Sequence, residues 1–347
     1  MVYRLPFTAS TTFTVSTISR LERLQRIDAT SFARRNQMEC ILLGSGGMMP
    51  MPYRLLTSLA VRVDGQIYLF DAGEGTQLGL KKTKTGVRGL DVLAVSHLHA
   101  DHCLGIPGIM MLRSQINDPE PLTILGPPGI KKFIQQAHEN LEFFLNYQIT
   151  FLEWSSESDE VAYQNDQVRI IWHPLEHSRF CLGYRLEELD RPGKFKPHLA
   201  ASLGIPKGPH WGQLQQGQKV TLEDGKEITP DQVLGESRRG RHVAYVVDTR
   251  PSKGVYRLCK DADIAFMEGM FLPEDAEHAE AKGHLTVVDA ARVAERAGVG
   301  RAVLVHISPR YGSDELPLLA AAAQSRFDSA EMGEDCKVYQ VPLPEDD

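Results

Sequence analysis

The segment 96–102, SHLHADH, constrains this chain more than any other, and it follows directly on the apolar run DVLAV. Its nitrogen and oxygen donors are His97, His99, Asp101 and His102. Alternate positions of an extended segment point to one side, so His97 and His99 can converge on one ion, and a following turn can bring Asp101 and His102 onto a second. Imidazole and carboxylate ligands without a thiolate favour zinc, with manganese or iron as alternatives. The pattern predicts a two-metal site at the end of a buried strand.

Three further donors stand in the same kind of position. His177, Asp248 and His306 each come after an apolar run that predicts a buried strand. A single histidine or aspartate at a strand end is more often a capping or hydrogen-bonding residue. Together with the first cluster, however, these three supply the extra ligands that a two-metal site needs.

Apolar runs of strand length recur along the chain, and helical patterns lie between several of them. The expected strands are 39–44, 58–63, 66–70, 92–95, 122–125, 149–153, 168–172, 243–247, 263–267 and 301–306. A tight Asp64-Gly65 turn joins the second and third as a β-hairpin. The clearest helix has a capping-box-like start at Thr286-Val-Val-Asp289 and ends at Gly298. Because strands and helices intermix throughout, the fold class is α/β or α+β.

Composition restricts the kind of protein. With 347 residues, of which 42% are hydrophobic, the chain can bury a large core. No stretch approaches the roughly 18 consecutive apolar residues of a membrane helix, so we expect a soluble protein with no membrane partner. The five cysteines are scattered and form no C-x-x-C pair, which favours a reducing compartment, the cytoplasm. The net charge of −7 gives no overall basic surface for nucleic acid, so such a partner needs a local patch.

Two segments depart from the rest of the chain. Residues 1–37 are rich in Ser, Thr and Arg, and we expect a disordered extension ahead of a domain at 38–347. A transit-like targeting segment, or an upstream start ahead of Met38, is the alternative. The stretch 191–219 is rich in Gly and Pro and has five basic residues and no carboxylate, which reverses the charge locally. Loops of this length in compact domains are usually functional or disordered.

Several motifs occur in an order that resembles a known family. Besides H-x-H-x-D-H they are LFDAGEGT (69–76), HSRFCLGYRLEE (177–188), AYVVDTR (244–250), GHLT (283–286) and HISPRY (306–311). The series is similar to that of the metallo-β-lactamase superfamily and, within it, of the ribonuclease Z family, endonucleases that remove the 3′ trailer from precursor tRNA. The resemblance spans residues 38–312. It implies a four-layer αββα sandwich with two metals at the edge between its sheets, and a protruding flexible arm inserted at about 190–235.

The resemblance also assigns roles to the donors. It implies two zinc ions per subunit, with His97, His99 and His177 on one, Asp101, His102 and His306 on the other, and Asp248 bridging both. Asp71 would hold the ligand loop from behind, a role in which outer residues orient the ligands themselves. The alternative for Asp71 is an ordinary aspartate in a turn.

Catalytic residues follow from the same resemblance. It implies that Asp101 receives a proton from the attacking water and that His284, oriented by Glu268, protonates the leaving oxygen. Capping of the helix that begins at Thr286 is the alternative for His284. The family's H-E-A-T is M-E-G-M here, and its G-H-S-T is G-H-L-T, which loses one hydroxyl.

Two arginines match positions near the substrate. Arg54 resembles the arginine of the family's P-x-x-x-R-N loop, which lies near the 3′ end of the substrate, but Leu55 replaces the asparagine. Whether precursors that carry CCA are cut or spared is therefore left open. Arg310 is expected to hold a phosphate, with a structural salt bridge as the alternative.

The basic segment corresponds to the arm that clamps the tRNA body in this family. Gly208-Pro209 matches a Gly-Pro motif of the arm, and Lys194, Lys196 and Lys207 are expected to contact phosphates without reading sequence. Phe195 and Trp211 either stack on a base or anchor the arm. Because the arm of one subunit can serve the other's active site in the family, a homodimer is implied.

Two other functions fit parts of the sequence. A hydrolase of the same fold acting on a small substrate, such as a phosphodiesterase, lactonase or sulfatase, would share every metal ligand but would have no use for the arm. A non-catalytic RNA-binding member would not need the metals. All seven ligand positions are filled, which argues against that second alternative.

Overall fold

Two seven-stranded sheets dominate the computed structural model, which describes residues 37–155 and 160–344. Apart from Gln37, the expected extension lies outside the described residues. In spatial order, the first sheet consists of β16 (Val338–Gln340), β1 (Met38–Gly44), β2 (Ser58–Val63), β3 (Gln66–Phe70), β4 (Leu90–Ala94), β5 (Leu122–Gly126) and β6 (Ile149–Glu153). The second consists of β15 (Ala330–Met332), β14 (Ala302–Val305), β13 (Ile264–Glu268), β12 (His242–Val246), β9 (Cys181–Glu188), β8 (Val168–Leu175) and β7 (Glu160–Gln164).

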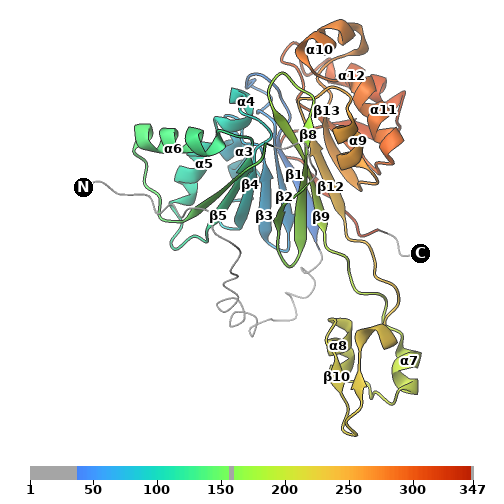
Figure 1. The fold of residues 1–347 in the computed structure, drawn as a ribbon. Coiled ribbons are helices and arrows are strands. Elements are labelled where there is room, and N and C mark those ends of the chain that lie inside the picture. The colour runs from blue at the N-terminus through green and yellow to red at the C-terminus, as the bar shows by residue number, and fades with distance from the viewer. Residues whose placement is uncertain (1–36, 156–159, 345–347) are drawn as a thin grey trace.

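The two sheets lie between outer layers of helices (Figure 1). Three apolar layers hold these sheets and their helices together. The layer between the sheets takes one face of most strands, and the outer layers take the other, as in β2, where Leu59 and Val61 face the middle layer and Ala60 faces outward. The helices over the first sheet are α3 (Thr76–Lys82), α5 (Ile106–Arg113) and α6 (Ile130–Leu141). Those over the second are α9 (Lys253–Cys259), α10 (Ala276–Lys282), α11 (Val287–Ala297) and α12 (Leu316–Gln324). The predicted αββα sandwich is confirmed.

The two local signals with the clearest chemistry are confirmed. Asp64 and Gly65 both have positive φ, 47° and 90°, which the tight hairpin turn between β2 and β3 requires. Helix α11 begins where expected, because the Thr286 hydroxyl accepts a hydrogen bond from the Asp289 N–H at 3.1 Å, and it ends at Gly298. Thr286 therefore caps the helix.

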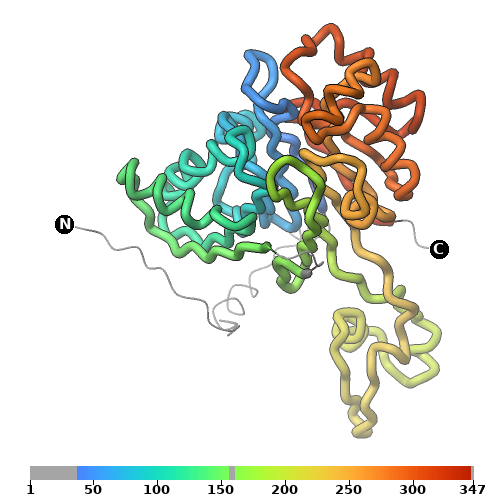
Figure 2. Tube along the Cα trace, turned by 45° about the horizontal axis from the view of Figure 1, so that its top comes forward, coloured from blue at the N-terminus to red at the C-terminus, as the bar shows by residue number. Residues whose placement is uncertain are grey.

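An arm leaves the sandwich after β9 and returns at β12, and Figures 1 and 2 show it standing away from the rest of the molecule. It contains α7 (Pro197–Ser202), α8 (Pro209–Gln215), β10 (Val220–Thr221), β11 (Glu227–Ile228) and the 3-10 turn η2 (Pro230–Gln232). At its neck, backbone hydrogen bonds of 2.7 and 2.9 Å join Arg191 and Arg238. The arm has an apolar core of its own, formed by Ala200, Ile205, Leu214, Val220, Ile228 and Val233. A segment expected to be a long loop is thus a small folded unit.

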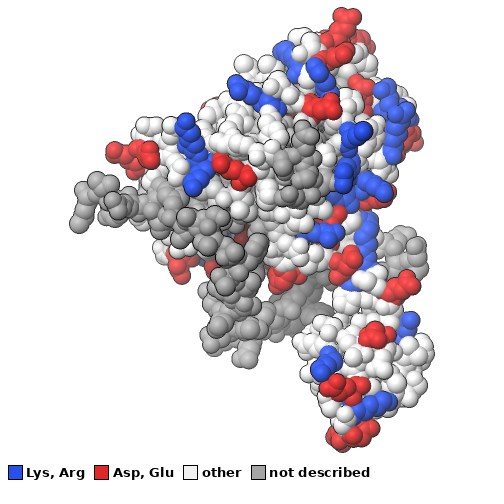
Figure 3. All heavy atoms as spheres, in the orientation of Figure 1, with Lys and Arg blue, Asp and Glu red and all other residues white. Residues whose placement is uncertain are grey.

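The charge of the arm differs between its two halves. The first half, 191–219, holds the five basic residues, whereas 220–236 holds five carboxylates and only Lys226 as a base. Acidic and basic side chains accordingly lie side by side on the arm (Figure 3), and Lys219 pairs with Glu227 at 3.0 Å. Between 191 and 236, basic side chains outnumber carboxylates only in the first half.

Candidate metal centre

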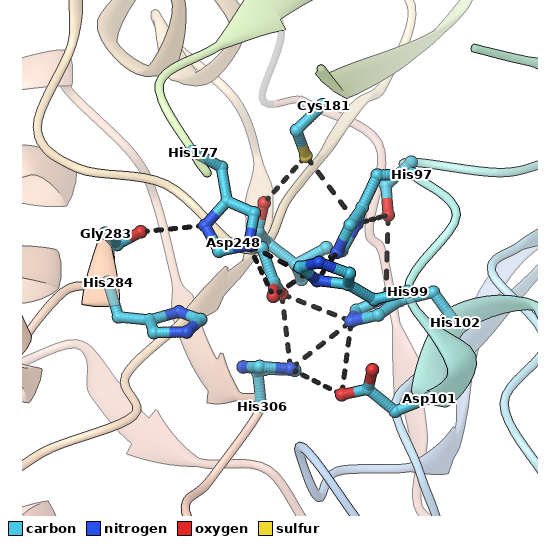
Figure 4. Close-up of polar contacts among 12 residues, drawn as sticks. His97, His99, Asp101, His102, His177, Cys181, Asp248, Gly283, His284 and His306 are labelled. Carbon is cyan, nitrogen blue, oxygen red and sulfur yellow. Dashed lines mark hydrogen bonds and ion pairs between the residues drawn. The ribbon is translucent and has the colours of Figure 1, made fainter. Parts of the chain in front are cut away.

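The seven predicted donors meet at one edge of the sandwich, where strands of both sheets end (Figure 4). The cluster of residues 97–102 follows β4 and leads into the short helix α4 (Ala100–Cys103). From the second sheet, Asp248 follows β12, His306 follows β14, and His177 lies between β8 and β9. Residues separated by about two hundred positions in the sequence thus form one cluster.

Three residues at these strand ends have a left-handed backbone. The φ angles are 55° for Asp71, 51° for Asp248 and 58° for His306. For residues other than glycine this conformation costs on the order of 1–3 kcal/mol each, and such residues gather at functional sites. The sharp turn after each strand directs Asp248 and His306 at the other donors (Figure 4).

One group of donors contains three histidines and one oxygen of Asp248. The Nε2 atom of His97 lies 2.8 Å from His99 Nδ1, which in turn lies 3.4 Å from His177 Nε2. Asp248 Oδ2 lies 3.6 Å from His97 Nε2 and 3.7 Å from His177 Nε2. The four side chains present ligand atoms to a common point.

The second group contains the remaining donors and the other oxygen of the same carboxylate. Asp248 Oδ1 lies 3.3 Å from His102 Nε2 and 3.2 Å from His306 Nε2, and these two nitrogens are 3.3 Å apart. Asp101 Oδ2 lies 3.3 Å from His306 Nε2 and 3.6 Å from His102 Nε2. Asp248 therefore has one oxygen in each group.

These spacings fit divalent metal ions. Ligands at about 2.0–2.1 Å around a tetrahedral zinc lie roughly 3.3–3.4 Å from one another, and most of the separations above fall near that value. Asp248 Oδ1 is also buried without a hydrogen-bond donor. Because buried polar atoms are normally paired, an unsatisfied carboxylate oxygen among imidazoles fits a ligand of a cation.

Charge supports the same conclusion. Four carboxylates lie in or behind the cluster, and Asp71, Asp248 and Glu268 are at most 2% exposed. Among the described residues, every ion pair of these carboxylates is with a histidine, and none is with lysine or arginine. Burying several carboxylates without permanent positive charge is costly. Bound cations would offset that cost.

Burial and neighbouring charges also shift the pKa values of the donors. Burial, with the neighbouring His102, lowers the pKa of His97 well below its usual value, which favours the neutral form that binds metal. Burial opposes ionisation of Asp248, but His306, His102 and His97 outweigh it and lower the pKa of that carboxyl well below its usual range. Asp248 is therefore an ionised carboxylate, the form required of a bridging ligand.

Asp71 supports the cluster from behind. One of its carboxylate oxygens accepts hydrogen bonds from the Ser96 hydroxyl at 2.7 Å and the Tyr245 hydroxyl at 2.8 Å, and lies 2.8 Å from His102 Nδ1. The other oxygen accepts the Ser96 N–H at 2.6 Å. Because His102 Nδ1 is held in this way, its Nε2 faces the second group. Ser96 and Tyr245 had no assigned role in the sequence, since a serine and a tyrosine in apolar runs give no local signal.

Glu268 and His284 form a pair beside the second group. Glu268 is fully buried, and its Oε2 lies 2.8 Å from His284 Nδ1, while its Oε1 accepts the Thr249 N–H at 2.6 Å. The His284 ring stacks on His306, with centroids 5.4 Å apart. Burial lowers the pKa of His284, but the charge and hydrogen bond of Glu268 outweigh it and raise the pKa to about 8. The predicted orientation of His284 by Glu268 is thus present in the structure.

The two arginines expected to contact substrate are placed differently. Arg54 is only 4% exposed, and its two terminal nitrogens are buried without a hydrogen-bond partner, so a substrate could reach them only after the loop moves. Arg310 pairs with Asp275 at 2.6 Å and lies over the Phe271 ring. For Arg310 the structure favours the salt bridge given as the alternative.

The residues assigned to the arm lie on its surface. Lys194, Lys196 and Lys207 are exposed, and Gly208 is the N-cap of α8, with Pro209 as the first residue of that helix. Phe195 and Trp211 pack on one another, with ring centroids 4.9 Å apart, and Trp211 also donates to the Ile205 carbonyl at 3.2 Å. These two aromatic residues pack against the apolar core of the arm itself.

Comparison with known proteins agrees with the fold. A family model described as a beta-lactamase superfamily domain matches residues 198–307, and one described as the metallo-beta-lactamase superfamily matches residues 56–112. Human tRNase Z, short form, superposes with a TM-score of 0.64 at 21% identity, covering 88% of this chain and 100% of that one. The sandwich and its edge cluster therefore define a hydrolase of the metallo-β-lactamase fold.

Curated relatives narrow the class. A ribonuclease Z of Treponema denticola is 39% identical over 298 residues, which are 86% of this chain and 96% of the relative. A ribonuclease Z of Haloferax volcanii is 38% identical over 310 residues, which are 89% of this chain and 97% of that relative. The chain belongs to the ribonuclease Z family. Within the described part of the chain, no helix has the length and apolar character needed to cross a membrane.

Proposed function

We propose that this chain is a zinc-dependent endoribonuclease that removes the 3′ trailer from precursor tRNA and leaves a 3′-hydroxyl on the tRNA. The observation that carries the proposal is the position of Asp248, whose two oxygens lie 3.2–3.7 Å from ligand nitrogens of two separate groups. The relatives named ribonuclease Z and the neighbour named tRNase Z support the choice of substrate.

In this proposal each group holds one ion. His97, His99 and His177 hold the first, Asp101, His102 and His306 hold the second, and Asp248 is shared; manganese or iron are alternatives to zinc. Ions in these places would supply Lewis-acid activation of a water molecule and stabilise negative charge on the phosphate. Asp71 keeps His102 in the orientation that ligation needs, through the contact of 2.8 Å at Nδ1.

The protein supplies the proton transfers. Asp101 accepts the proton of the attacking water, and it is held in place because its Oδ2 accepts the Met48 N–H at 2.7 Å. His284 donates a proton to the departing 3′ oxygen of the tRNA. Since its Nδ1 is bound to Glu268 at 2.8 Å, its Nε2 is the nitrogen that can face the substrate.

The test is cleavage of a precursor tRNA with a 3′ trailer, with and without a chelator, followed by mapping of both product ends. We expect a 3′-hydroxyl on the tRNA, a 5′-phosphate on the trailer, loss of activity with the chelator and recovery with zinc. A parallel precursor carrying CCA shows how Leu55 affects discrimination. Hydrolysis of a small phosphodiester without cleavage of the precursor would favour a small-substrate hydrolase instead.

The arm is the proposed tRNA-binding element. Because the backbone bonds between Arg191 and Arg238 close its neck, residues 192–237 can be replaced by a short Gly-Ser turn without opening the body. We expect this variant to lose cleavage of precursor tRNA and to keep hydrolysis of bis(p-nitrophenyl) phosphate, because only the large substrate reaches the arm. The ratio of the two kcat/KM values measures the effect, and an equal loss on both substrates contradicts the clamp.

Point variants refine the arm prediction. Exchange of Lys194, Lys196 and Lys207 for glutamine should reduce the dependence of log(kcat/KM) on log salt by about 1 per lost phosphate contact. Lys219→Gln is the matched control, because Lys219 lies on the same arm and is paired with Glu227 at 3.0 Å.

A homodimer is also proposed. Helices α3 and α5 pack closely, since a Cβ on Gly108 would meet Gln77 at 3.0 Å, and beside this contact Leu78, Leu104 and Met111 are exposed. Exposed apolar side chains on and beside two packed helices suit a partner surface. A mass in solution of twice the 38.7 kDa of one chain would support it.

A further inference from the structure

The loop between β1 and β2, residues 45–57, lies directly against the candidate metal centre. The Met48 N–H donates to Asp101 Oδ2 at 2.7 Å, and the Gly47 N–H donates to the Ile307 carbonyl at 3.0 Å. Gly47 is so close to the His306 ring that a Cβ on it would lie 2.7 Å from His306 Nε2. The loop therefore contacts two of the donors of the second group.

Backbone hydrogen bonds join the two ends of this loop, from the Gly46 N–H to the Leu55 carbonyl at 2.9 Å and from the Thr57 N–H to the Gly46 carbonyl at 2.8 Å. A distant carboxylate binds both ends as well. Asp335 Oδ1 accepts hydrogen bonds from the Ser45 N–H at 2.9 Å and the Ser45 hydroxyl at 2.7 Å. Asp335 Oδ2 accepts the Leu55 N–H at 2.5 Å. One side chain thus binds both ends of the loop, from a position 280 or more residues further along the chain.

The turn that carries Asp335 is itself fixed between the two sheets. It joins β15, at the edge of the second sheet, to β16, at the edge of the first. Its Gly333 N–H donates to the Leu304 carbonyl at 2.7 Å, and its Cys336 N–H donates to the Leu42 carbonyl at 2.7 Å. Asp335 is therefore anchored independently of the loop that it binds.

We propose that Asp335 is a positioning residue for the metal centre: it holds the 45–57 loop closed, so that Met48 orients Asp101 and Gly47 confines His306. Hydrogen bonds to a charged acceptor are the strong ones, and three of them converge on this carboxylate. When the neck opens, Asp101 loses the Met48 N–H and its carboxylate turns toward solvent. The inference concerning the metal rests on the proposed function, whereas loop closure does not.

Two variants weaken the contacts of Asp335 with the loop to different extents. In Asp335→Asn the single amide oxygen can accept hydrogen bonds either from Ser45 or from the Leu55 N–H. The NH₂ group then faces the backbone N–H of the other residue, and the two donors cannot form a hydrogen bond. Ser45→Ala removes only the hydroxyl bond of 2.7 Å. Glu334→Gln is the matched control, because Glu334 is the exposed neighbour in the same turn. We expect the largest change in loop exchange and zinc affinity in Asp335→Asn and a smaller change in Ser45→Ala. Glu334→Gln should behave like the wild type.

Two measurements test the proposal on the full chain. Amide hydrogen exchange of the metal-free protein should show residues 45–57 exchanging about tenfold faster or more in Asp335→Asn, while β12 to β14 stay protected. The free zinc concentration for half-loading should rise by about tenfold or more, as for other residues that orient ligands. A lower melting temperature with unchanged loop exchange and unchanged zinc affinity would mean a merely structural role and overturn the proposal. If the wild type binds no zinc, the proposed function fails, and the exchange result alone decides whether Asp335 closes the loop.

Discussion

Replacement of Asp248 by asparagine is expected to remove both metal ions and to lower kcat/KM on precursor tRNA by on the order of 10³-fold or more, since metal ions supply several kcal/mol of transition-state stabilisation. The side chain has one oxygen in each ligand group, so the loss of its charge affects both ions together. Metal per chain, measured by emission spectroscopy, and kcat/KM are the two readouts.

Asp261→Asn is the matched control for this prediction. Asp261 has the same left-handed backbone, with φ of 51° as at Asp248, and belongs to neither donor group. The chemical change and the backbone conformation are then equal, whereas Asp248 is buried in the metal centre and Asp261 is exposed. Retention of two metal ions by Asp248→Asn would show that this carboxylate does not bridge them.

Replacement of His284 by alanine is expected to lower kcat on precursor tRNA by about 10²–10⁴-fold, the usual contribution of a general acid, with the metal content unchanged. The kcat of this variant on a phosphodiester that releases p-nitrophenolate should fall much less, because that leaving group departs without a proton. The comparison of the two substrates separates proton donation from any effect on the centre as a whole.

His278→Ala is the control for His284. His278 lies in α10, the helix that leads to His284, and its ring contacts Phe271 with centroids 5.3 Å apart. An equal loss on both substrates in His284→Ala, or loss of metal, would contradict the assignment of His284 as the acid.

Much of the fold and of the cluster could be predicted because strand ends are marked locally. An apolar run predicts a strand, and the donor residue after it marks the end of that strand at the edge of the sheet. This holds even when the predicted first and last residues of the strand are inexact. β2, β3 and β6 begin and end where expected, whereas β4 covers residues 90–94 rather than 92–95. The displacement does not matter for the site, since the donors 97–102 still follow the strand.

The elements that were missed lack such a mark. β9 is buried from Cys181 to Glu187, so its pattern does not alternate, and the edge strands β15 and β16 have three residues each. In the arm, Gly and Pro suggested a loop, but Pro197 and Pro209 each stand at the start of a helix, where proline is tolerated. Contacts such as that of Asp335 with Ser45 join residues 290 positions apart and have no local pattern at all.

The order of the ligands along the chain has a consequence during synthesis. A nascent polypeptide that has emerged from the ribosome as far as the arm already carries five of the seven donors, but Asp248 and His306 follow the arm and come from the second sheet. The centre cannot be assembled until β14 has been translated and docked. A nuclease built in this way has no competent metal site until nearly all of its second sheet has been synthesised.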